Sequence, residues 1–145
     1  MTQEEKDLVL KDICSRLPYN VKAYVKHWSS IDQKYYEGVY DVKSAFPSLN
    51  EIHVQSKSGS VDVTLGYYDH EFKPYLFPLS SMTEEQKKEI EDILIELSLK
   101  AISDEIGSEV VASYEIDFYC KNHLDYRGLI EMGIAIDATG LGIYE

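Results

Sequence analysis

The sequence is poor in several residue types that would narrow its class at once. Its 145 residues include two cysteines, four prolines and one tryptophan. Cys14 and Cys120 lie far apart with no second ligand nearby, so we expect two buried, reduced thiols, with a single disulfide as the alternative in an oxidising compartment. A chain of this length buries roughly 68–70% of the surface that its unfolded form exposes. It therefore needs neither a metal nor a disulfide to fold.

Long hydrophobic runs are also missing. No apolar stretch approaches the ~18 residues that a transmembrane helix needs, and the acidic segment 1–7 lacks the apolar core of a secretory signal. There is no proline-rich or serine-rich linker, internal repeat or low-complexity tract. We therefore expect a single cytoplasmic domain, residues 1–145, that does not associate with membranes.

Positive charge is scarce, and the imbalance is uneven along the chain. The net charge is −12; residues 1–72 carry 8 Lys and Arg against 11 Asp and Glu, whereas residues 73–145 carry 6 against 15. A negative field repels phosphate backbones, so we expect no direct binding to nucleic acid. An acidic surface can instead engage a basic partner or imitate a phosphate backbone, and ordinary solubility also accounts for it.

The first half of the chain predicts a helix followed by an antiparallel meander. Thr2 and Glu5 have the spacing of a capping box, and Pro18 ends the helix that they begin. Apolar and polar residues then alternate over 21–28, as in a half-buried strand. Similar patterns predict further strands around 38–46, 52–54 and 61–65, and a short strand at 75–77 that its flanking prolines confine to an edge.

A long helix should run from Ser81 or Thr83 to about Ser103, because both residues have capping-box partners three positions on. This helix has two apolar stripes. The first consists of Ile90, Ile93, Leu94, Leu97 and Ala101, and the second of Ile95, Leu99 and Ile102. We expect the first stripe to face the sheet and the second to be covered by the C-terminal segment or by a second subunit. Cover by the C-terminal segment is favoured, which predicts a monomer.

The C-terminal third is harder to interpret. Residues 110–120 alternate like a strand, but a helix over 113–122 also fits and is favoured here. Asp125 suits the N-cap of a short helix over 126–132 that Gly133 would close. The fold class that follows is α+β: an N-terminal helix, an antiparallel meander of four to five strands, then a long helix and one or two short C-terminal helices packed on one sheet face.

Three segments together are similar to a known group of proteins: Arg16–Tyr19, Lys73–Glu85 and His123–Glu131. On these the chain resembles a family of short proteins of gut bacteria, often encoded in prophage or mobile-element neighbourhoods. The similarity is weak over residues 27–68. The resemblance implies a cytoplasmic protein from a mobile element, and it implies no catalytic residues because none is assigned to the family.

Few residues suggest chemistry. His53, Asp69, His70 and Glu71 could supply metal ligands, but neighbours on an extended chain point to opposite sides. Cys120 lies three residues before His123, a spacing that a cysteine nucleophile or ordinary packing would equally fit. Acidic pairs are too common here to be a signal, and no loop cradles a phosphate, so no cofactor is expected.

The candidates for contact with a partner are Tyr75, Tyr126 and Arg127. Tyrosine, of which there are twelve, suits both sheet faces and contact surfaces. A structural account also fits, in which Asp125 caps, Tyr126 packs and Arg127 pairs with a carboxylate. We therefore expect a small non-enzymatic interaction module from a phage or mobile element, whose acidic face engages a basic partner or mimics nucleic acid. The alternative is a metal-binding protein or hydrolase that uses His53, Asp69, His70 and Glu71.

Overall fold

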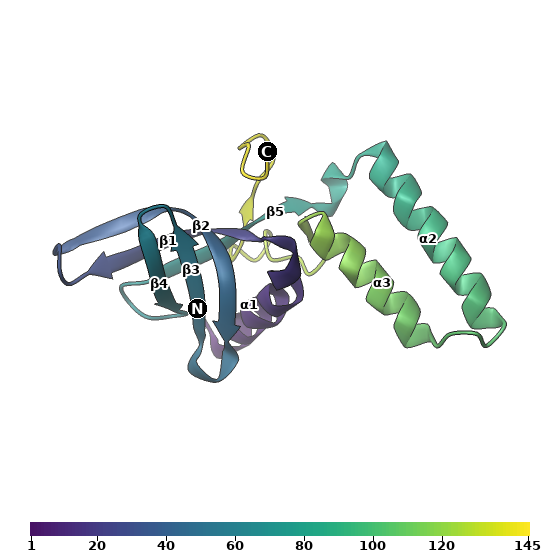
Figure 1. The fold of residues 1–145 in the computed structure, drawn as a ribbon, viewed down its shortest axis with the longest axis horizontal. Helices are drawn as coiled ribbons and strands as arrows, with labels where there is room; N and C mark the ends of the chain where they lie inside the picture. Colours follow the sequence, from purple (N-terminus) through teal and green to yellow (C-terminus); the bar gives the residue numbers. More distant parts are fainter.

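The computed structural model describes all of residues 1–145 and consists of a bent sheet, one helix against that sheet, and a helical hairpin at its side (Figure 1). The order of helix, antiparallel meander and helices confirms the expected α+β class. No helix is both long and apolar enough to cross a membrane. In chain order the elements are α1 (Gln3–Arg16), β1 (Lys22–Ser29), β2 (Lys34–Phe46), β3 (Glu51–Ser56), β4 (Gly59–Thr64), β5 (Glu71–Pro78), α2 (Glu84–Ile102), α3 (Ser108–Lys121), β6 (Leu124–Asp125) and β7 (Ile136–Asp137).

The sheet has the order β4-β3-β2-β1-β5-β6, with β7 also paired to β5. The long strand β2 belongs to both halves: residues 34–41 pair with β1, and residues 41–46 pair with β3. A register shift between Val42 and Ser44 interrupts the second pairing. Irregularities of this kind bend a strand and increase its twist. The β3–β4 hairpin consequently runs across the direction of β1 (Figure 1).

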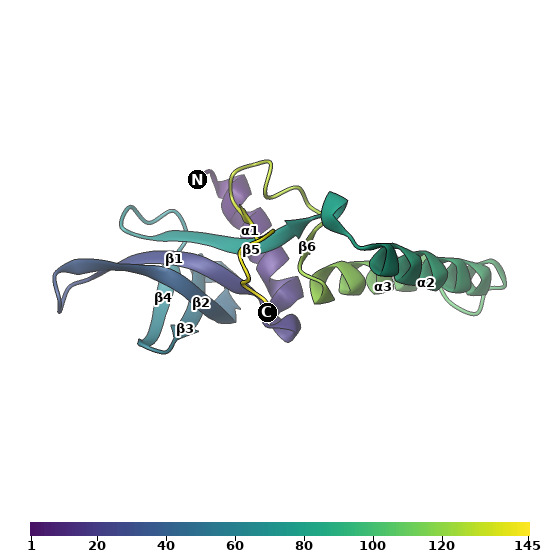
Figure 2. The same cartoon turned by 90° about the horizontal axis from the view of Figure 1, so that it is seen from above.

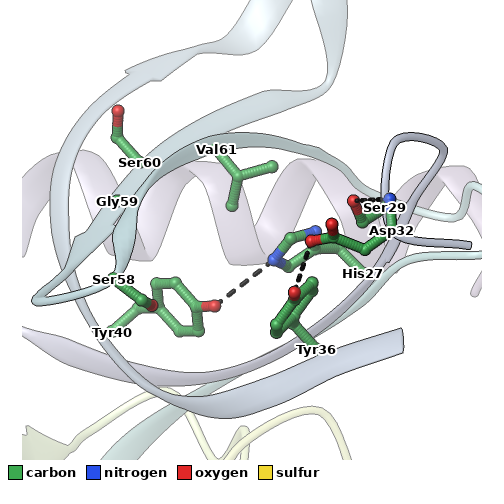
Figure 3. Close-up of a pocket in the computed structure, with 9 residues that line it drawn as sticks. All are labelled: His27, Ser29, Asp32, Tyr36, Tyr40, Ser58, Gly59, Ser60 and Val61. Carbon is green, nitrogen blue, oxygen red and sulfur yellow. Dashed lines mark hydrogen bonds between the residues drawn. The ribbon is translucent and has the colours of Figure 1, made fainter. Parts of the chain in front are cut away.

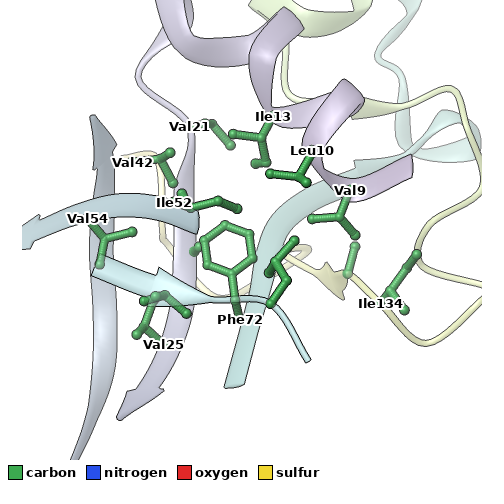
Figure 4. Close-up of a cluster of buried hydrophobic side chains, with 14 of the residues drawn as sticks. Val9, Leu10, Ile13, Val21, Val25, Val42, Ile52, Val54, Phe72 and Ile134 are labelled. Carbon is green, nitrogen blue, oxygen red and sulfur yellow. The ribbon is translucent and has the colours of Figure 1, made fainter. Parts of the chain in front are cut away.

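The main core lies between α1 and the inner face of this bent sheet (Figure 4). The capping box of Thr2 and Glu5 starts α1 as expected, and the helix buries Val9, Leu10 and Ile13. The alternation predicted for β1 is confirmed, because Val21, Ala23 and Val25 are fully buried. Across from α1 the sheet contributes Val42, Ile52, Val54, Val63 and Phe72.

Strand β5 differs from the prediction of a short strand at an edge. It is eight residues long and pairs with β1 and with the two short parallel strands β6 and β7. The two halves of β5 have different partners. β1 pairs with Glu71–Pro74, whereas β6 and β7 pair with Tyr75–Pro78. No residue of β5 is therefore paired on both sides. This arrangement tolerates prolines inside a sheet, because the missing N–H can face an unpaired side.

Helices α2 and α3 form a hairpin that projects from the side of the sheet (Figures 1 and 2). Thr83 is the N-cap of α2 and shares a capping box with Gln86, which decides between the two predicted starts. The hairpin packs mainly on itself, around a small cluster of Ile90 from α2, Phe118 from α3 and Leu124 from β6. Thus α1 covers the sheet, and the first apolar stripe of α2 faces α3 rather than the sheet.

The C-terminal region corrects two further expectations. The helix favoured over 113–122 exists, but it begins at Ser108. The short helix predicted over 126–132 is absent, and this segment is a series of turns. Asp125 still caps the backbone there, since its carboxylate accepts hydrogen bonds from the N–H groups of Leu129 and Ile130 at 2.9 Å each. Gly128 adopts a φ of 77°, a conformation that glycine permits and that a helix does not contain.

A buried cluster of charges joins the hairpin to the rest of the protein. Asp12 of α1 contacts Arg16 at 2.7 Å, and both side chains are completely buried. The same carboxylate lies 3.2 Å from Nε of Arg127 in the turns after β6. Arg16 also donates a hydrogen bond of 2.7 Å to the carbonyl of Leu124, the residue that follows α3 by a short turn. One carboxylate therefore holds α1, β6 and the turns together.

Replacing Asp12 with alanine should destabilise the protein strongly, because Arg16 and Arg127 would lose their ion-pair partner. Removing one partner of a buried ion pair costs about 3–5 kcal/mol of the free energy of unfolding. Urea denaturation measures this loss. The matched control is Asp7→Ala on the exposed side of the same helix, which should cost well under about 1 kcal/mol. Equal losses in the two variants would contradict the importance of the cluster.

Candidate interaction surface

One hollow lies at the open end of the sheet, where β1 and β2 meet the β3–β4 turn (Figure 3). His27 of β1 and Tyr36 and Tyr40 of β2 project from the same face of the sheet. His27 is directly paired with Tyr36, and directly paired residues share a sheet face. Nε2 of His27 lies 3.3 Å from the hydroxyl of Tyr40, and the hydroxyl of Tyr36 donates to Asp32. Val61 and three small residues close the other side: Ser58, Gly59 and Ser60.

This pocket has groups that could exchange protons but no assembled nucleophile. None of its serines hydrogen-bonds to His27. The hydroxyl of Ser58, for example, is paired with that of Ser56 at 2.8 Å. A catalytic serine needs a base within hydrogen-bond reach. The pocket volume of about 210 Å³ is also below the roughly 300–1,000 Å³ of ligand pockets. The pocket is therefore a weak candidate for a substrate site.

The four residues proposed as metal ligands are not brought together. His53 of β3 pairs with Asp62 of β4 through Nδ1 at 2.7 Å, as a cross-strand pair. Asp69 accepts a hydrogen bond from the hydroxyl of Tyr35 at 3.0 Å. Nδ1 of His70 accepts the N–H of Thr64 at 3.0 Å, so this nitrogen is occupied. Glu71 simply begins β5, and no group of three or more metal-binding side chains forms.

The three residues proposed for partner contact lie mostly inside the molecule. Tyr75 is buried with 8% of its surface exposed. Tyr126 stacks on Tyr119 with ring centroids 5.5 Å apart, and Arg127 holds Asp12 while lying over the Tyr126 ring. The structural account of this segment, in which the aspartate caps, the tyrosine packs and the arginine pairs, agrees with these contacts.

The cysteines also lack the surroundings of a nucleophile. Cys120 is completely buried, and burial raises the pKa of its thiol, which disfavours the reactive thiolate. His123, which lies three residues after Cys120, instead stacks its ring on that of Tyr144, with 3.7 Å between the centroids. Tyr144 in turn donates its hydroxyl hydrogen to the carbonyl of Tyr75 at 2.6 Å, which fixes the C-terminal tail. Cys14 is exposed, contrary to the expectation of two buried thiols, and both cysteines are free.

The hairpin exposes the second apolar stripe of α2. Exposure is 54% for Ile95, 63% for Leu99 and 80% for Ile102. The expectation that residues 113–136 cover this stripe is therefore wrong. Those residues supply Leu129, Ile134 and Ala135 to the main core, so their apolar surface is already used.

A groove of about 530 Å³ adjoins this stripe and is lined mostly by apolar side chains. Leu94, Ile95 and Leu99 of α2 form one wall, and Tyr119 of α3 contributes to the other. Glu91 supplies a carboxylate in the lining. Tyr119 is fixed there by a hydrogen bond of 2.9 Å to Glu115, one helical turn earlier. The hairpin surface, as we name this groove together with the stripe, is a preformed and largely apolar site.

Negative charge is concentrated on the same hairpin. Residues 84–121 carry eleven carboxylates against four lysines, a net charge of −7 out of −12 for the whole chain. Three of the lysines are paired with glutamates of the hairpin itself, in the pairs Lys87–Glu84, Lys100–Glu96 and Lys121–Glu89. Most of the carboxylates therefore have no cation beside them. An apolar surface on so acidic a hairpin can attract a cationic, partly apolar ligand.

Acid should weaken the fold through His123, which lies at the end of α3. Burial lowers the pKa of this histidine to about 4 from the ordinary 6.5. Between these values the unfolded chain binds a proton that the folded chain does not, so the free energy of unfolding falls as pH drops through this window. Because the ring is partly exposed, we expect a loss of about 1–2 kcal/mol, less than the full conversion of the shift.

Urea denaturation of the wild type and of His123→Gln between pH 7 and pH 4 measures this effect. The carboxylates titrate in both proteins, so the relevant quantity is the difference between the two pH slopes. The glutamine variant should lose less stability on acidification. Identical slopes would contradict the assignment to His123.

Comparisons with protein-family models, with curated proteins and with solved structures found no match. The proposals below accordingly rest on the geometry and charge of the hairpin.

Proposed function

We propose that the protein is a small non-enzymatic interaction module, encoded by a phage or mobile element, that engages a basic partner protein through its hairpin surface. The single observation that carries this proposal is the exposed stripe of Ile95, Leu99 and Ile102 on a projecting, acidic hairpin. The origin from a mobile element rests only on the three segments that resemble such proteins.

The stripe favours a binding role because exposing it has a cost and its position is accessible. Burying a side chain such as leucine contributes about 1.5–3 kcal/mol, and contiguous exposed apolar patches commonly mark interaction sites. The projection of the hairpin leaves this surface open to a large partner (Figure 2). The charge of −7 around it selects against acidic partners and accelerates the approach of basic ones.

Affinity capture from a lysate of the native host tests the proposal. Immobilised wild-type protein should retain a partner with a basic contact region, and Leu99→Glu should lose it, because a charge then replaces an apolar contact. The matched control is Leu49→Glu, which makes the same change at similar exposure, 59% against 63%, in the turn after β2. Retention of the same partners by all three proteins would contradict the proposed surface.

We further expect no direct binding to DNA or RNA, because the net charge of −12 repels phosphates. A mobility-shift titration at physiological salt should show no complex. Affinity tighter than the ~10⁻⁴–10⁻⁶ M of ordinary non-specific binding would contradict this expectation.

A further inference from the structure

We infer that the occupant of the hairpin surface is a basic amphipathic helix, which lies along α2 and α3 as the third helix of a bundle. This inference rests on the proposed function and specifies the chemistry of the partner. Its apolar side would meet the stripe and the groove, and its lysines and arginines would lie against the carboxylates of the hairpin.

The shape of the surface favours a helix over an extended strand. The groove runs between two packed helices, whose backbone hydrogen-bonding groups are satisfied within each helix. Such a surface offers no free N–H or C=O row to which a strand could add. Rows of side chains on one helix do fit the groove between two others.

The spacing of the stripe gives the occupant its pattern. Ile95, Leu99 and Ile102 are separated by four and then three residues, which places them on one side of α2. Toward the N-terminal end of the helix the groove continues to Leu94 and Ile90. At 1.5 Å per residue, Ile90 to Ile102 spans about 18 Å. The matching ligand is a helix of three to four turns with apolar residues at positions i, i+3 or i+4, and i+7.

Charge distinguishes this occupant from a second copy of the protein. Two hairpins placed face to face would each bring a net charge of −7 to the contact, and the lysines that could offset it are largely paired already. Like charges across an interface suppress such pairing. A basic helix would bring a cation to Glu91, whose carboxylate belongs to the groove lining. Its binding should therefore weaken as salt screens these charges.

Synthetic peptides test the inference with the full-length protein. The first is a fluorescein-labelled 18-residue peptide of leucine and lysine with leucines at helical spacing. The second has the same composition with strict alternation, and the third has the helical spacing with glutamate in place of lysine. Fluorescence anisotropy measures binding, and circular dichroism measures the helix formed. Wild type is compared with Leu99→Glu, with Ile102→Glu and with the matched control Leu49→Glu.

The helical lysine peptide should bind the wild type and gain helix, whereas the other two peptides should bind at least about tenfold more weakly. Leu99→Glu and Ile102→Glu should each reduce affinity about tenfold or more, and Leu49→Glu should leave it within about twofold. Two substituted sites, both exposed, guard against the misfolding of one variant. Equal binding of the alternating peptide, or no effect of either stripe variant, would overturn the helical occupant.

The outcomes separate this inference from the proposed function. If no helical peptide binds but capture of a natural partner still depends on Leu99, the occupant is not a basic helix and the interaction module stands. If capture does not depend on Leu99, the proposed function falls. Analytical ultracentrifugation that finds a dimer of the wild type, dissociated by Leu99→Glu, would assign the surface to a second copy and overturn the inference.

Discussion

The arrangement of this protein depends on one buried carboxylate. Asp12 is the ion-pair partner of both Arg16 and Arg127, and Arg16 also donates a hydrogen bond to the carbonyl of Leu124, where the hairpin re-enters the body. Two guanidinium groups taken out of water are tolerable only when paired. The pairing therefore dictates that α1, β6 and the turns after it come together. The same contacts hold the base of the hairpin, and α2 and α3 project from that base.

Buried apolar side chains are distributed unevenly between the body of the protein and the hairpin. The body contains a main cluster of seventeen buried apolar residues, whereas the hairpin cluster has three: Ile90, Phe118 and Leu124. A region with few buried contacts opens more readily than the core. The hairpin also leaves the stripe of Ile95, Leu99 and Ile102 exposed. In the body, polar side chains such as His53 and Asp62 pair with one another across strands.

The sequence predicted those features that depend on neighbours along the chain. Capping at Thr2 and Thr83, the alternation of β1 and the hairpin between β3 and β4 all follow from short-range rules. The predictions from the sequence were wrong where pairing with a distant segment determines the structure. Pro74 and Pro78 indicated an edge strand, but two short strands from the C-terminal region pair with the second half of β5. The helix expected after Asp125 gave way to turns that bring Arg127 to Asp12.

The hairpin surface illustrates the same limit. Both stripes of α2 were visible in the sequence, but no local pattern states which apolar segment covers which. Leu129 and Ile134 have suitable side chains, yet the parallel pairing of β6 and β7 with β5 draws their segment onto the body. The C-terminal tail is fixed there as well, through the hydrogen bonds of Tyr144 to β1 and β5. Because Leu129, Ile134 and Ala135 belong to the main core, this segment does not cover Ile95, Leu99 and Ile102, which stay exposed.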